Sequence, residues 1–229
     1  SIPHFEKMLY DNAALLGLYA QVGAQRGLDD VQAVACATAE WLISDMQDAR
    51  GGFHSSIDAD AAGEEGSYYV WTRDEVQSLL GADYAGFAEQ YGLAGAANFE
   101  GRWHLRRPAP GSNQPLTPPS ATTLAQLRKL HAARASRVAP ARDDKILTSW
   151  NALTIRALAS AGRLLSRTDF IAAAERAFDF IIQHHWRDGR LLATSRHGVA
   201  SVPGYLDDHG FMLAATVELL NCRWRRGDL

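Results

Sequence analysis

Cysteine is scarce in this sequence. Cys36 and Cys222 are its only two cysteines among 229 residues, and no C-x-x-C pair is present. A zinc knuckle and a dithiol redox site both need such a pair, so neither is predicted from this chain. Isolated cysteines inside helical patterns are usually small buried side chains. So few of them suit a reducing compartment, and we expect the protein to be cytoplasmic.

Long apolar runs and a large excess of one charge are also absent. No run reaches the roughly 18 apolar residues needed to cross a bilayer. The first residues lack the basic and apolar regions of a signal peptide. The net charge is only −3, so nothing recommends a nucleic acid or a membrane as a partner. Hydrophobic residues make up 47% of the chain, which predicts a globular fold with a core of its own.

Several motifs with known chemistry are missing. The sequence has no G-x-G-x-x-G, no Walker A motif, no H-E-x-x-H and no G-x-S-x-G, so the four corresponding classes are disfavoured and no cofactor is predicted. The acidic loop at 58–66 resembles a calcium loop only at first sight. An EF-hand that begins at Asp58 needs oxygen ligands at positions occupied by Ala62 and Tyr69. No metal site is therefore predicted.

Hydrophobic periodicity predicts a mainly helical chain. The first helix is almost entirely apolar or small, which predicts burial on most of its sides. Residues 51–57 and 67–71 are expected to pair as a β-hairpin around the acidic loop, and residues 92–119 to be mostly loop. Helices are predicted over 8–25, 29–47, 72–80, 83–91, 120–138, 149–165 and 169–186, with a further helix from about Tyr205.

The helices form a degenerate internal repeat. A small-residue helix, a turn and an amphipathic helix occur at 8–47 and again at 149–186, and a third unit begins at Tyr205. Arrays of αα-hairpins close most naturally into a toroid or solenoid. Two hairpins and the start of a third are too few to close one. We therefore predict an all-α fold, a partial (α/α)6 barrel with small β-hairpin excursions, that is part of a longer protein.

Three polar-aromatic clusters stand at the starts of three apolar helices, at 3–12, 143–151 and 204–211. Their common position predicts one shared pocket. Carboxylates and imidazoles in such a pocket suit general acid–base chemistry. For the cluster at 204–211, the alternative is a purely structural role, in which two Asp residues cap the helix and the His has no function. The candidates are Asp208 and Asp11 for acid and base, with Asp207, His4 and His209 beside them.

Other residues of these stretches suit the binding of a sugar, because carboxylates accept hydrogen bonds from hydroxyl groups and aromatic faces stack on C–H surfaces. The alternatives are a solvated acidic hairpin tip for the loop and a loop-ordering ion pair between Lys145 and Asp144. The candidate substrate-binding residues are Asp58, Asp60, Glu64, Glu65, Tyr69, Trp71, Asp144, Lys145, Trp150, Asn151 and Tyr205.

Five blocks occur in order: PHFEKMLYDNA at 3–13, DADAAGEEGSYYVW at 58–71, NFEG at 98–101, DDKILTSWNA at 143–152 and GYLDDH at 204–209. In these blocks the chain resembles the thioredoxin-domain proteins called spermatogenesis-associated protein 20 in animals and YyaL in bacteria. The resemblance implies an N-terminal thioredoxin-like domain, absent from this chain, and an (α/α)6 barrel like those of six-hairpin glycosidases and N-acylglucosamine 2-epimerases. Residues 1–229 are expected to form part of one such barrel, without its later hairpins. The pocket is expected at the N-terminal ends of the inner helices.

These observations lead to one main hypothesis and two alternatives. The main hypothesis is a carbohydrate-active domain, glycosidase-like or sugar epimerase-like, that acts on a small sugar. The first alternative is a non-catalytic α/α scaffold that presents partners to the thioredoxin-like domain. The second, a metal-dependent hydrolase, needs three or more of the acids and histidines on one ion.

Overall fold

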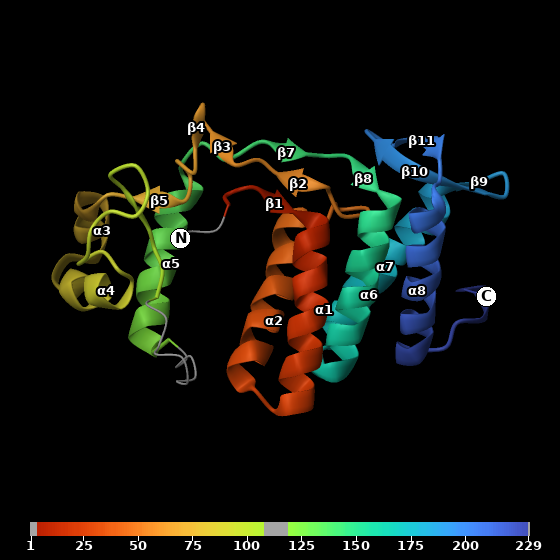
Figure 1. Cartoon of the computed structure of the whole chain (residues 1–229), viewed down its shortest axis with the longest axis horizontal. Coiled ribbons are helices and arrows are strands. Elements are labelled where there is room, and N and C mark those ends of the chain that lie inside the picture. Colours follow the sequence, from red (N-terminus) through yellow and green to blue (C-terminus); the bar gives the residue numbers. More distant parts are fainter. Residues whose placement is uncertain (1–3, 108–118, 229) are drawn as a thin grey trace. The chain divides into compact units, whose positions relative to one another are not determined.

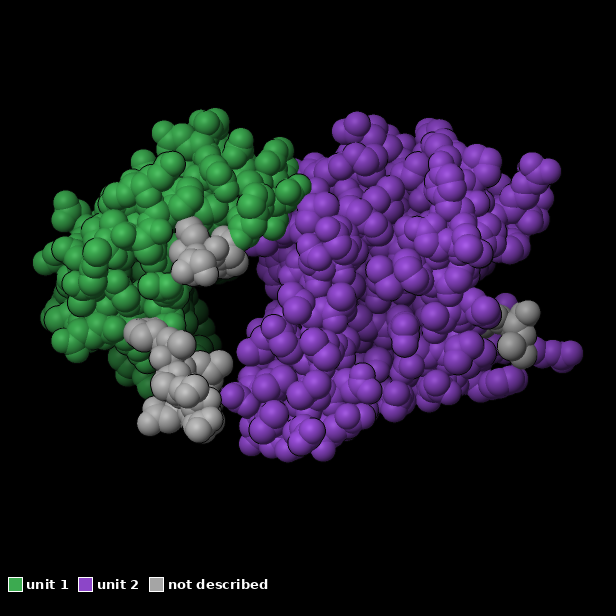
Figure 2. All heavy atoms as spheres, in the orientation of Figure 1, with its two compact units in different colours: residues 1–6, 58–141 green, residues 7–57, 142–229 purple. Residues whose placement is uncertain are grey.

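A computed structural model describes residues 4–107 and 119–228. Pro3 of the first cluster and residues 108–118 of the predicted loop lie outside these ranges. The chain divides into two compact units (Figure 2): a first unit of residues 1–6 and 58–141, and a second unit of residues 7–57 and 142–229. Each unit has a hydrophobic core of its own.

The second unit is built from two αα-hairpins and a further helix. The first hairpin is α1 (Leu9–Arg26) with α2 (Asp29–Trp41), which continues into a π-helical turn at Leu42–Met46. The second is α6 (Thr148–Leu164) with α7 (Thr168–His185), and α8 (Leu206–Cys222) follows. Helix α6 packs against α1, α7 and α8. The prediction of a mainly helical chain with small strands is thus confirmed.

Short strands lie at the end of the second unit where α1, α6 and α8 begin (Figure 1). One sheet has the order β1 (Lys7–Met8), β2 (Ser56–Ile57) and β7 (Arg142–Asp143), and all its pairs are antiparallel. The other contains β8 (Ile146–Leu147), β10 (Arg190–Arg196) and β11 (Val199–Pro203), with β9 (Trp186–Arg187) paired to β10. The predicted pairing of residues 51–57 with residues 67–71 is wrong. Strand β2 pairs instead with β1, which precedes it in the sequence, and with β7, which comes after residues 67–71.

Helix α6 is the most deeply buried helix of the second unit. Its buried residues lie all round its axis and include Ala152, Ile155 and Leu158, each 0% exposed. At Gly162 a Cβ atom would lie 2.6 Å from the Ile171 side chain and 2.8 Å from the carbonyl oxygen of Arg167. Only glycine therefore allows α6 and α7 to approach this closely.

Helices α1 and α8 each bury one face only. In α1, Leu16 and Ala20 are buried, whereas Leu15 and Leu18 are 43% and 54% exposed. The prediction that the first helix is buried on most sides is therefore wrong. The opposite face of α8 exposes 67% of Leu213. No helix within the described ranges is both long and apolar enough to span a membrane.

The first unit combines three helices with short strand pairs: α3 (Arg73–Leu80), α4 (Tyr84–Gln90) after a 3₁₀ turn at Gly81–Asp83, and α5 (Ala121–Ala135). Strands β3 (Asp60–Ala61) and β4 (Glu64–Glu65) pair across the acidic loop. The predicted capping box of Thr72 and Glu75 begins α3. Strand β5 (Val70–Trp71) pairs with β6 (Trp103–His104), a strand inside the stretch predicted to be loop.

A buried hydrogen-bond network around His185 connects three elements of the second unit. The Thr148 hydroxyl donates to the carbonyl of Leu192 at 2.6 Å, so its oxygen accepts from Nδ1 of His185 at 2.7 Å. The other ring nitrogen, Nε2, then accepts from the Ser195 hydroxyl at 2.8 Å. His185 is 0% exposed. Its burial, together with the charges of His184 and Arg187, lowers its pKa to about 4.

We expect the second unit to lose stability as the pH falls below 6.5. The folded state holds His185 neutral with a pKa of about 4, whereas the unfolded chain binds a proton near pH 6.5. The contribution is full above pH 6.5 and is lost as the pH falls toward 4. Linkage gives a loss of about 2 kcal/mol in unfolding free energy between pH 7.5 and pH 5.

Urea unfolding at several pH values tests this expectation. His185→Gln lowers stability at pH 7 and flattens the pH dependence. The matched control is His184→Gln, because His184 is only half-buried. This variant keeps most of the slope, since burial is a larger cause of the lowered pKa of His185 than the charge of His184. Equal slopes in both variants would contradict the role given to His185.

Candidate functional site

Hydrogen bonds join the first turn of α6, in the predicted cluster at 143–151, to the start of α8, in the predicted cluster at 204–211. The backbone N–H of Ser149 donates to Oδ1 of Asp208 at 2.8 Å, and the backbone N–H of Tyr205 donates to Oδ2 of Asp208 at 2.8 Å. Asp208 is 2% exposed. Both carboxylate oxygens thus cap helix N-termini, that of α6 and that of its own helix α8, where the helix dipole favours a negative charge. Through these contacts Asp208 holds the starts of α6 and α8 together.

Asn151 is buried completely and binds backbone only. Its Oδ1 accepts from the N–H of Phe53 at 2.7 Å, and its Nδ2 donates to the carbonyls of Phe53 and Leu147, both at 2.9 Å. At 0% exposure its side chain is enclosed by these backbone partners, so the contacts seen are structural, and its binding of a substrate stays a prediction. In the first repeat, Asn12 makes the matching bond back to Met8 at 2.7 Å.

Aromatic contact brings the start of α1 to the start of α6, because the rings of Tyr10 and Trp150 lie 4.8 Å apart. Trp150 is half-buried, and the other predicted residues of these helix starts in the second unit are exposed: Asp11, Tyr205, Asp207 and His209. Nδ1 of His209 lies 2.8 Å from the carbonyl oxygen of Tyr205. The first cluster is divided between the units, since His4 belongs to the first unit.

The two remaining charged candidates of the second unit, Asp144 and Lys145, are each paired with a residue that was not a candidate. Lys145 forms an ion pair with Asp143 rather than with Asp144, the partner considered from the sequence. Although burial acts to raise it, the hydrogen bonds from Lys145 hold the pKa of Asp143 below its ordinary value. Asp144 accepts from Nε of Arg196 at 2.8 Å, and this bond lowers its pKa. These pairs order the loop before α6.

The acidic loop of the first unit forms a solvated hairpin tip. Its four candidates, Asp58, Asp60, Glu64 and Glu65, are all exposed. Glu65 lies 4.0 Å from Nε2 of His4, which is itself exposed. In residues 4–107 and 119–228, no group of three or more His, Cys, Asp or Glu side chains is placed to hold a metal ion.

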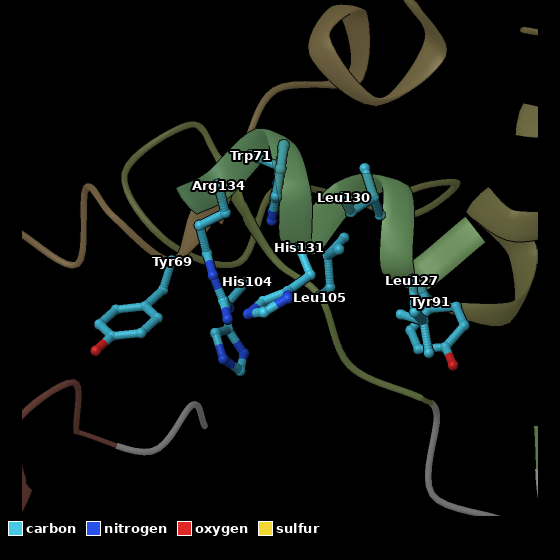
Figure 3. Close-up of a pocket in the computed structure, with 9 residues that line it drawn as sticks. All are labelled: Tyr69, Trp71, Tyr91, His104, Leu105, Leu127, Leu130, His131 and Arg134. Atoms are coloured by element: carbon cyan, nitrogen blue, oxygen red, sulfur yellow. The ribbon is translucent and has the colours of Figure 1, made fainter. Parts of the chain in front are cut away.

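Two other candidates of the first unit, Tyr69 and Trp71, share a cavity of about 310 Å³. This cavity, here called the aromatic pocket, is shown in Figure 3. Helix α5 contributes one face, because residues at spacings of three and four in a helix lie above one another. The pocket is lined by Tyr69, Trp71, Tyr91, His104, Leu105, Leu127, Leu130, His131 and Arg134.

Neighbouring side chains hold the walls of the aromatic pocket in place. The amide of Asn98 donates to the carbonyl of His104 at 2.9 Å and accepts from its N–H at 2.7 Å, which holds strand β6 against the segment around Asn98. Phe5 stacks on Tyr69 with a centroid distance of 5.8 Å. The guanidinium of Arg137 lies 4.0 Å from the centre of the Trp71 ring.

The polar groups of the aromatic pocket are hydrogen-bond donors, cations or imidazoles. Burial raises the pKa of Tyr91, so its phenol stays protonated at neutral pH. The nitrogen atoms of His104, His131 and Arg134 gather in one part of the pocket (Figure 3). Sequence reasoning missed these three residues. The three- and four-residue spacing of α5 was a signal for His131 and Arg134, whereas His104 lies in a stretch that gave none.

Comparison with known proteins places the chain beside one group of relatives. It is 30% identical to human spermatogenesis-associated protein 20 and 29% identical to the mouse protein, each over 95% of this chain and 33% of the relative. An uncharacterized protein of Caenorhabditis elegans is 26% identical over 95% of this chain and 35% of its own length. The chain thus spans about a third of the curated relatives that it matches. The family resemblance found in the sequence blocks is confirmed.

Two further comparisons add less. No protein-family profile matches the chain. Among solved structures, cellobiose 2-epimerase from Spirochaeta thermophila is similar with a TM-score of 0.31 and 12% identity, covering 94% of this chain and 71% of that one. A TM-score of this size carries no argument about fold or reaction.

The contacts of Asp208 predict that Asp208→Asn destabilises the second unit. The amide can accept one of the two backbone N–H groups, but its NH₂ then faces the other one. Leaving a buried N–H unsatisfied costs about 1–3 kcal/mol, or a few degrees in melting temperature for a chain of this size. Thermal unfolding measures the change.

The adjacent Asp207→Asn is the matched control, because Asp207 is exposed in the same helical turn. It should stay within about 0.5 kcal/mol of the unaltered protein. If Asp208→Asn melts at the temperature of this control, the capping role is wrong and Asp208 is available for chemistry.

Proposed function

We propose that this chain, a relative of the spermatogenesis-associated protein 20 proteins, is a carbohydrate-active domain whose sugar site is the aromatic pocket. The observation that carries the proposal is that Tyr69 and Trp71, singled out from the sequence as ring-binding side chains, line one cavity together. Aromatic faces pack against the C–H surface of a sugar ring, while hydroxyl and imidazole groups at the edges bind its hydroxyls. Polar groups among apolar walls are typical of small-molecule sites.

The lining of the aromatic pocket favours the epimerase-like branch of this proposal over the glycosidase-like branch. Glycoside hydrolysis generally uses two carboxyl groups on either side of the scissile bond. None of the nine lining residues is Asp or Glu, whereas two are histidines, His104 and His131. Imidazoles are the commonest side chains for moving protons near neutral pH. In this scheme one imidazole removes a proton from the carbon next to the carbonyl of the open-chain sugar, and the carbonyl takes up the electron pair as an enolate. The other imidazole returns a proton to the opposite face of that carbon as the carbonyl re-forms.

The helix starts of the second unit are a second candidate location for the sugar. Asp11, Asp207 and His209 have exposed side chains there, and the aromatic pair of Tyr10 and Trp150 lies at the starts of α1 and α6. In this arrangement Asp11 and Asp207 are the acid–base candidates. Asp208 serves them indirectly, by holding the starts of α6 and α8 together.

A non-catalytic α/α scaffold is the alternative function. Its supporting observation is that two charged candidates are already paired with other residues, Lys145 with Asp143 and Asp144 with Arg196. The scaffold would present partners to a thioredoxin-like domain of a longer protein. It differs from the main proposal in one measurable respect, because it requires no affinity for sugars.

A thermal-shift panel of mono- and disaccharides tests the main proposal. A sugar at 100 times its dissociation constant should add about 2.7 kcal/mol to the unfolding free energy. We expect Trp71→Phe to reduce the shift, because a benzene ring covers less of the sugar while still filling the core.

Trp150→Phe is the control and should leave the shift unchanged. The reverse pattern would move the sugar to the helix starts of the second unit. The absence of a shift with every sugar would reject the carbohydrate proposal in favour of the scaffold.

Hydrogen exchange tests the epimerase-like branch separately. A sugar that binds should take up deuterium at one carbon during incubation in D₂O, measured by mass spectrometry. Loss of one acid–base group should slow the exchange at least about 100-fold in His131→Ala. Arg128→Gln, on an exposed part of the same helix, should not slow it. Sugar binding without any exchange would leave a binding domain and eliminate the epimerase chemistry.

A further inference from the structure

Arg134 differs from the neighbouring Arg137, which is paired with Glu75, in having no charged partner. Within the described part of the chain it forms no ion pair, and its buried Nε atom has no hydrogen-bond partner. Its guanidinium lies against two tyrosine rings, 5.4 Å from the centre of Tyr68 and 5.7 Å from that of Tyr69. Burying a polar nitrogen without a partner costs free energy, and no carboxylate of the described residues offsets the charge of this guanidinium.

Two other arginines of the first unit, Arg137 and Arg73, are already engaged. Arg137 donates to the carbonyls of Tyr68 and Val70 at 3.0 and 2.7 Å and lies 3.2 Å from the carboxylate of Glu75. Arg73 donates to the carbonyl of Leu93 at 2.8 Å. These two guanidinium groups hold the backbone of the unit together, whereas Arg134 lines the cavity.

The rest of the lining adds donors and supplies no competing carboxylate. His104 and His131 gather with Arg134 in Figure 3, and none of the nine lining residues is acidic. Leucine side chains form the remaining wall, and a less polar wall strengthens any charge pair beside it. A guanidinium presents parallel N–H groups that match a carboxylate or a phosphate.

We propose that the aromatic pocket recognises a sugar that carries a negative charge, with Arg134 binding the charged group, Tyr69 covering the ring, and the largely buried Trp71 forming part of the wall against which the ring packs. This inference rests on the proposed function and specifies its ligand. The shared chemistry is an anionic group on a single ring, either the carboxylate of a sugar acid or the phosphate of a sugar phosphate. A cavity of about 310 Å³ lies at the small end of the range for ligand pockets and suits one ring.

Isothermal titration calorimetry at fixed ionic strength and pH 7 tests the inference with four probes: glucuronate, glucose 6-phosphate, glucose and inorganic phosphate. We expect one or both charged sugars to bind at least tenfold more tightly than glucose and than inorganic phosphate. In Arg134→Gln this preference over glucose should vanish. Arg134→Lys should restore part of it, because it restores the charge but not the paired N–H geometry.

The matched control is Arg128→Gln, which removes the same charge from an exposed position of α5 and should leave all four affinities unchanged. Far-ultraviolet circular dichroism and melting curves of the variants show whether each one is folded. Because Arg134 makes no ion pair, Arg134→Gln should melt within a few degrees of the control.

The outcomes separate the two proposals. Equal binding of glucose and the charged sugars would overturn the charge preference and leave the sugar site in place. Inorganic phosphate binding as tightly as glucose 6-phosphate would show an anion site that ignores the ring, and would overturn the sugar site. If none of the four probes binds, both proposals are wrong at this pocket. An unchanged preference in Arg134→Gln would reject Arg134 as the anion partner.

Discussion

The second unit depends on the burial of polar groups in the first turn of α6. Within four residues, Thr148 binds His185 of α7, the N–H of Ser149 binds Asp208 of α8, and Asn151 binds the backbone of Phe53. Each of these groups is removed from water, so each must find its partner or cost free energy. The partners come from three different segments. The helices around α6 therefore cannot shift independently, and α1 is added to them through the Tyr10–Trp150 contact.

This constraint explains why several residues that resemble catalytic groups serve the fold. A carboxylate at a helix start is equally suited to take a proton and to cap a helix, and the difference lies in what surrounds it. Asp208 is enclosed by two backbone N–H groups, whereas Asp207 beside it faces solvent. In the first unit, by contrast, a charged side chain faces a cavity and is not used to hold the backbone. The neighbours of Arg134 satisfy the backbone, and Arg134 itself lines the aromatic pocket with two imidazoles and no acid.

Local signals predicted the helices well, because they depend on residues close in sequence. The α1–α2 and α6–α7 hairpins have nearly the predicted bounds, and the capping box of Thr72 and Glu75 begins α3 as expected. Strand pairing was predicted poorly. Residues 51–57 were predicted to pair with residues 67–71, the next apolar stretch of the sequence. Instead, β2 pairs with β1 and β7. Strands of two residues carry almost no pattern of their own, so their partners are set by the packing of the helices that they join.

By itself the sequence determined the helical repeat, the family resemblance, and the positions of Tyr69 and Trp71 as candidate ring-binding side chains. The repeat follows from hydrophobic periodicity, the resemblance from the ordered sequence blocks, and the ring-binding candidates from their residue type. Only the tertiary structure decided which polar groups are enclosed and which face a cavity. It buried Asn151 and Asp208 against backbone from distant segments, and it brought His104 from a predicted loop to His131 and Arg134 on α5. Burial and pairing depend on residues far apart in the chain, and no local pattern records them.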